Sequence, residues 1–95
     1  MRAIALSPAY STAWGVRGES RLALGDLEKA ASDFARGISL EPEEPGFYLL
    51  RAQLALARKD FADVVEDCDK AMQLAPRTWE GRAHAEQLKA QAKRP

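Results

Sequence analysis

Residues 13–42, AWGVRGESRLALGDLEKAASDFARGISLEP, decide the fold because a second version of this stretch follows directly in the chain. Residues 47–76 read FYLLRAQLALARKDFADVVEDCDKAMQLAP, and a shift of 34 residues brings the two stretches into register. A shorter third copy, residues 3–8, matches residues 37–42 and ends in the same Leu-X-Pro pattern. Self-similarity at a period of about 20–50 residues is the signature of a repeat protein. The register pairs residues of the same kind, namely Trp14 with Tyr48, Arg17 with Arg51, Leu27 with Phe61, Ile38 with Met72, Leu40 with Leu74 and Pro42 with Pro76.

Each copy has the pattern of two helices joined by a tight turn. In residues 11–24, the packing residues recur at intervals of three and four, which is typical of one helical face. We expect Gly25 to end this helix in the left-handed conformation and Asp26 to cap the next helix, which ends before Pro42. The face of the first helix comprises Trp14, Arg17, Gly18, Arg21 and Leu24.

The second copy carries comparable helix signals. Pro45 suits the first turn of a helix, and Asp60 with Asp63 resembles a capping pair ahead of the next one. A last helix is expected from about Thr78 to Lys93. Its apolar face comprises Gly81, Ala85, Leu88 and Ala92.

A period of 34 residues with these packing residues resembles the tetratricopeptide repeat. The first full unit matches at Ala13, Trp14, Gly18, Leu24, Gly25, Asp26, Ala30, Phe34, Gly37, Ile38, Leu40 and Pro42. The second unit departs from the pattern at three places: Lys59 stands where the turn glycine is usual, Val64 replaces alanine, and Cys68 replaces the aromatic residue. The resemblance implies an all-α, helical-hairpin repeat solenoid with two full repeats plus a terminal capping helix. We expect the tail of a preceding repeat at 1–8, repeats at 9–42 and 43–76, and a capping helix with a basic tail at 77–95, forming one structural domain.

Small residues and recurring charges explain how such hairpins pack. Gly18 and Ala52 give their hairpins room for the close approach of paired helices. Arginine and aspartate also recur in register, as Arg17 with Asp33 and Arg51 with Asp67. We predict that each arginine reaches across its hairpin to its aspartate. The alternative is that both arginines extend into water.

Composition restricts the classes of function. The chain of 95 residues has 14 Lys+Arg and 14 Asp+Glu, so no net charge draws it toward nucleic acid or anionic lipid. No apolar run reaches the ~20 residues that span a bilayer, and the one cysteine cannot form an internal disulfide, so a cytoplasmic protein is the default expectation. A weak basic stripe at Arg82, Lys89 and Lys93 lacks the interleaved aromatic residues of a nucleic-acid surface.

Candidate catalytic groups are few. His84 has no companions at metal-ligand spacing, and Cys68 replaces a packing residue, so inert burial is its expected role. The loop acids Glu41, Glu43 and Glu44 are expected to be solvated. We therefore expect a protein that is not an enzyme and needs no cofactor or metal.

The resemblance also implies where a partner binds, because the first helices of such hairpins line a concave groove. The groove residues on this basis are Thr12, Gly15, Glu19, Leu22, Ala23, Leu49, Gln53, Leu56, Ala83 and Gln87. Leu22, Leu49 and Leu56 could equally belong to the core. Some relatives clamp the acidic C-terminal tails of chaperones, but Glu19 and the neutral Gly15, Leu49, Leu50 and Gln53 provide no such clamp, so that partner is not expected.

An apolar or mixed peptide, bound as a helix or an extended strand, fits this lining better. We expect a scaffold or adaptor that binds a protein. The alternatives are self-association through an open N-terminal edge around Ala3, Ile4 and Leu6, or a regulatory fragment of a larger multidomain protein.

Overall fold

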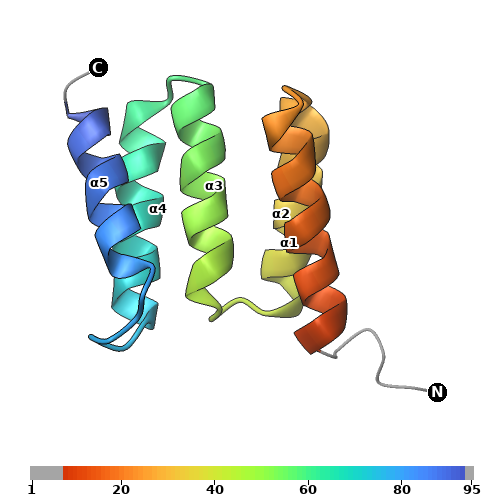
Figure 1. Ribbon diagram of the computed structural model, residues 1–95, viewed down its shortest axis with the longest axis horizontal. Helices are drawn as coiled ribbons and strands as arrows, with labels where there is room; N and C mark the ends of the chain where they lie inside the picture. The colour runs from red at the N-terminus through yellow and green to blue at the C-terminus, as the bar shows by residue number, and fades with distance from the viewer. Residues whose placement is uncertain (1–7, 94–95) are drawn as a thin grey trace. The chain divides into compact units, whose positions relative to one another are not determined.

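The structure is a computed structural model that describes residues 8–93. The described part of the chain contains helices and no strand. They are α1 (Pro8–Ala23), α2 (Leu27–Leu40), α3 (Pro45–Ala57), α4 (Phe61–Leu74) and α5 (Arg82–Ala92) (Figure 1). This confirms the all-helical class. No helix among these residues is long and apolar enough to cross a membrane.

The turn inside each hairpin uses a left-handed residue at the same place in the repeat. Gly25, after α1, has φ of 85°, and Lys59, after α3, has φ of 61°. The amides that follow return to the end of the preceding helix, where Asp26 N donates to Arg21 O at 2.8 Å and Asp60 N donates to Ala55 O at 2.8 Å. Glycine adopts this conformation freely, whereas lysine does so at a cost.

The helix starts differ in part from the expected caps. Asp26 and Asp60 occupy the N-cap positions of α2 and α4, but neither side chain accepts a hydrogen bond from the helix amides. The capping roles expected for them were therefore wrong. Glu44 does cap α3, because its carboxylate accepts a hydrogen bond from Gly46 N at 3.1 Å, and Pro45 lies in the first turn as expected.

The chain divides into two compact units between Glu43 and Glu44. In the first, α1 packs against α2, with Ala30 and Phe34 fully buried. Gly18 permits this contact, because a Cβ atom there would lie 2.5 Å from Cε1 of Phe34 and 3.0 Å from Cβ of Asp33. The helices can approach closely only because that position has no side chain.

In the second unit, α4 packs against both α3 and α5 (Figure 1). Its buried cluster takes residues from all three helices, so α5 completes the core rather than merely covering it. The cluster comprises Ala52, Ala55, Val64, Cys68, Ala85, Leu88 and Ala92.

The last helix is shorter than expected. It begins at Arg82 rather than near Thr78 because the preceding residues form turns, in which Trp79 N donates to Pro76 O at 3.0 Å and Arg82 N to Trp79 O at 3.2 Å. Gly81 is the N-cap residue and lies against the indole ring of Trp79. The expected apolar face is otherwise present, since Ala85, Leu88 and Ala92 are buried.

Candidate functional site

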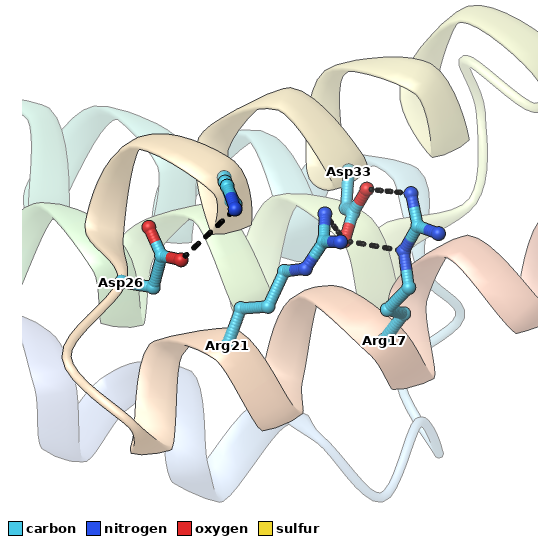
Figure 2. Close-up of polar contacts among 5 residues, drawn as sticks. Arg17, Arg21, Asp26 and Asp33 are labelled. Carbon is cyan, nitrogen blue, oxygen red and sulfur yellow. Dashed lines mark hydrogen bonds and ion pairs between the residues drawn. The ribbon is translucent and has the colours of Figure 1, made fainter.

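A buried carboxylate lies between the two helices of the first unit. Asp33, on α2, is only 1% exposed and receives three hydrogen bonds from arginines on α1 (Figure 2). Arg17 donates from Nε and Nη2 at 3.1 and 3.0 Å, and Arg21 donates from Nη1 at 3.0 Å. The predicted Arg17–Asp33 pair is therefore present, and Arg21 is a second donor that the repeat register alone did not reveal.

The charges of this cluster support one another. Hydrogen bonds from Arg17, together with the positive charges of both arginines, hold the pKa of Asp33 below its ordinary value despite its burial. The same hydrogen bonding raises the pKa of Arg17. Asp33 is therefore ionised at neutral pH, and its carboxylate ties α1 to α2.

The second unit repeats the arrangement with one donor fewer. Arg51 on α3 donates from Nε and Nη2 to Asp67 on α4, at 3.0 and 2.9 Å. The hydrogen bond to Asp67 raises the pKa of Arg51. The residue in register with Arg21 is Ala55, which lies in the buried cluster and donates no side-chain hydrogen bond.

Each unit also holds an aromatic ring next to two cations. The guanidinium carbons of Arg17 and Arg36 lie 4.9 and 5.5 Å from the centroid of the Trp14 ring. At the same places in the second unit, Arg51 Cζ and Lys70 Nζ lie 5.3 and 5.9 Å from the centroid of the Tyr48 ring. Such cation–π contacts are attractive because the face of an aromatic ring is electron-rich. The roles of Arg36 and Lys70 were not predicted from the sequence, although the 34-residue register aligns these residues.

The predicted groove residues fall into two groups. Exposed or half-exposed positions are Thr12, Glu19, Leu22, Ala23, Gln53, Ala83 and Gln87. By contrast, Leu49 and Leu56 are half-buried and pack against the core of the second unit, and Gly15 is buried. For these two leucines the structure favours the core over the groove, the alternative that helical spacing left open.

Two residues of the supposed basic stripe have structural partners. Arg82 Nη2 donates to the carbonyl oxygen of Met72, in the last turn of α4, at 3.2 Å. Lys89 Nζ lies 2.6 Å from Asp69 Oδ1 on α4. These contacts join α5 to α4, so Arg82 and Lys89 help to hold the last helix in place. The sequence could not show this, because the acceptor of Arg82 is a backbone carbonyl.

The remaining candidates for chemistry are separated. Cys68 is fully buried, and burial raises the pKa of its thiol to about 11, so the thiolate is absent at neutral pH. His84 is exposed. Within residues 8–93, no group of three or more histidine, cysteine or acidic side chains is arranged to hold a metal ion.

Comparisons with protein-family models, with curated protein sequences and with solved structures found no match to the chain.

Proposed function

We propose that this chain is a tetratricopeptide-type repeat module that binds a protein or peptide partner, as a scaffold or adaptor. The proposed binding surface comprises the exposed faces of α1 and α3, which are the first helices of the two hairpins, and of α5. The observation that carries the proposal is the repeated hairpin. Both hairpins place an arginine–aspartate pair and an aromatic ring at positions 34 residues apart. Repeats of this kind stack into an extended binding surface, because one hairpin cannot bury its apolar face alone.

Exposed polar residues of these helices are available to a partner. Glu19 on α1 and Gln87 on α5 are exposed and take no part in the ion pairs that hold the hairpins. The sequence alternative of self-association through Ala3, Ile4 and Leu6 lies outside the described residues.

The test compares two surface variants in affinity purification from source lysate with quantitative mass spectrometry. The groove variant is Glu19→Arg/Gln87→Arg. The control variant, Glu28→Arg/Gln73→Arg, makes the same charge changes at exposed positions of α2 and α4. Circular dichroism and thermal melting establish that both variants are folded before capture.

The expected result is one protein captured by wild type and the control but lost by the groove variant. Its direct binding is then measured by calorimetry with purified components. Equal capture by both variants would place the binding surface elsewhere, and the absence of any protein enriched above background would contradict a scaffold role.

A further inference from the structure

Three arginines of the first unit have one carboxylate between them as a hydrogen-bonding partner, although residues 1–43 together hold more acidic than basic side chains. Arg17 and Arg21 donate three hydrogen bonds to the carboxylate of Asp33, and Arg17 and Arg36 lie against the ring of Trp14. Arg36 is exposed and has no carboxylate partner among residues 8–93; its guanidinium group stacks on Trp14. Three cations and one anion leave a local excess of two positive charges.

This local arrangement of charges is not repeated in the second unit. In the second unit, Ala55 stands in register with Arg21, and Asp63 stands in register with Lys29. The negative charge of Asp63 also acts on Arg51, where it contributes to the raised pKa of that guanidinium. Arg51 therefore has two aspartates acting on it, whereas Arg17 and Arg21 share Asp33.

The guanidinium groups are also held in place and partly accessible. The side chain of Arg17 is 53% exposed, although two of its nitrogens are bound to Asp33. Arg21 uses only Nη1 on Asp33. Stacking on Trp14 positions Arg36 without using its N–H donors. Guanidinium groups that are held in this way lose little conformational entropy when they bind a carboxylate.

From this arrangement we propose that Arg17, Arg21 and Arg36, which lie beside Asp33 and Trp14 and are here called the guanidinium cluster, bind an acidic peptide segment of a partner protein. The segment carries at least two neighbouring carboxylates, one for Arg36 and one for the free donors of Arg17 and Arg21. Bidentate pairing of guanidinium with carboxylate gives this recognition its geometry. The half-buried ring of Trp14 supplies an apolar contact beside the charges.

This surface is distinct from the groove face of the proposed function. Successive residues of a helix are ~100° apart, so Arg17 and Arg21 share one side of α1 while Glu19 lies far around the helix. Residues 1–7 and 94–95 add no acidic side chain to the chain. Residues 1–7 contain Arg2 and no acid, and residues 94–95 are arginine and proline.

The test is an NMR titration of the full chain at low ionic strength, where surface electrostatics are least screened. The probes are blocked hexaglutamate and, as a neutral control, blocked hexaglutamine. The signals are the Trp14 indole N–H and the arginine Nε–H groups, assigned with single substitutions. Hexaglutamate should shift these signals in a saturable way, and hexaglutamine should not.

Two variants at positions in register give the specificity control. Arg36→Gln should weaken hexaglutamate binding about fivefold, as expected for loss of one exposed charge-assisted contact. Lys70→Gln, the same change in the second unit, should leave the affinity unchanged. Neither side chain pairs with Asp33 or Asp67, and each variant loses one exposed cation–π contact, so both should remain folded with similar, small decreases in melting temperature. Arg36→Lys keeps the positive charge but loses the planar guanidinium group, so its affinity for hexaglutamate should lie between those of wild type and Arg36→Gln.

Several results would overturn the proposal. Absence of shifts at millimolar hexaglutamate would exclude the site, and equal weakening by Arg36→Gln and Lys70→Gln would show unspecific attraction. Tighter binding of hexathymidylate than of hexaglutamate at the same residues would identify a phosphate surface. Shifts of the same signals on concentrating the protein alone would assign the cluster to a contact between copies of this chain.

Discussion

At the scale of single residues, each of the two buried aspartates joins the helices of its hairpin by accepting hydrogen bonds from arginine, but the number of bonds differs. Asp33 accepts three hydrogen bonds from two arginines, and Asp67 accepts two from one. Asp33→Asn should therefore destabilise the chain by about 2 kcal/mol, and Asp67→Asn by less, because a hydrogen bond to a charged group contributes more than a neutral one. Urea denaturation monitored by circular dichroism measures both changes in unfolding free energy. A larger loss for Asp67→Asn would contradict this account.

The contribution of Asp33 should also depend on pH, with a sign that follows from its pKa. Folding lowers this pKa, so the folded state binds the proton less readily than the unfolded chain does. The stabilisation is fully present above the unfolded value of about 3.9 and is lost as pH falls through the lower, folded value. The difference in unfolding free energy between wild type and Asp33→Asn should be constant from about pH 7 to 5 and shrink below about pH 4. A constant difference down to about pH 2 would show that Asp33 does not titrate with folding.

Lys59 is a strained residue that the repeat register identifies. Its φ of 61° is costly for a residue with a side chain, whereas Gly25 holds the same place in the first unit at little cost. Lys59→Gly should stabilise the chain by about 0.5–1 kcal/mol, net of the entropy that glycine adds to the unfolded state. The reverse change, Gly25→Lys, should destabilise it. Thermal melting of the two variants checks the direction of both changes in stability. A lower melting temperature for Lys59→Gly would show that the backbone of Lys59 is not strained.

At the scale of elements, the sequence was informative wherever the period itself carried the signal. The 34-residue register located the hairpins, the arginine–aspartate pairs and the left-handed turn positions. It did not locate the start of α5, because the turns at 76–82 are set by backbone hydrogen bonds that no side-chain pattern encodes. It also missed the role of Arg82, whose acceptor is the carbonyl oxygen of Met72.

The packing of α1 on α2 depends on one complementary pair of positions. Gly18 faces Phe34 so closely that a Cβ atom would overlap the ring, while the corresponding positions of the second unit hold Ala52 and Cys68. Gly18→Ala should therefore destabilise the chain by about 1–3 kcal/mol through overpacking. Phe34→Cys alone should cost about 3 kcal/mol or more through the cavity it leaves.

Together, the two substitutions copy the pair found in the second unit, so the added methyl group occupies space that the ring vacates. The double variant should be less destabilised than the sum of the single variants, by roughly 0.5–3 kcal/mol of coupling. Chemical denaturation of wild type, the two single variants and the double variant provides the double-mutant cycle. Simple additivity would mean that the two residues do not share this space.

At the scale of the whole molecule, the two units differ in how many helices protect their cores. The first buries its side chains between two helices, and the second buries them among three, with α4 in contact with both α3 and α5. The units also differ in surface charge, because the guanidinium cluster has no charge-matched equivalent in the second. Binding surfaces and stability are thus distributed unequally over a chain whose sequence is nearly periodic.

This inequality predicts an order of local opening. The stability of each part of a protein depends on the contacts that it buries, so the part with fewer packed helices opens at lower free energy. Native-state hydrogen exchange should show the slowest amides in α4 and faster exchange in α1 and α2. Asp33→Asn sharpens the test: it should accelerate exchange in α1 and α2 while leaving α4 and α5 near their wild-type rates. Equal acceleration in all the helices would instead show that the two units unfold as one cooperative body, and the ion pair of the first unit would then stabilise the second as well.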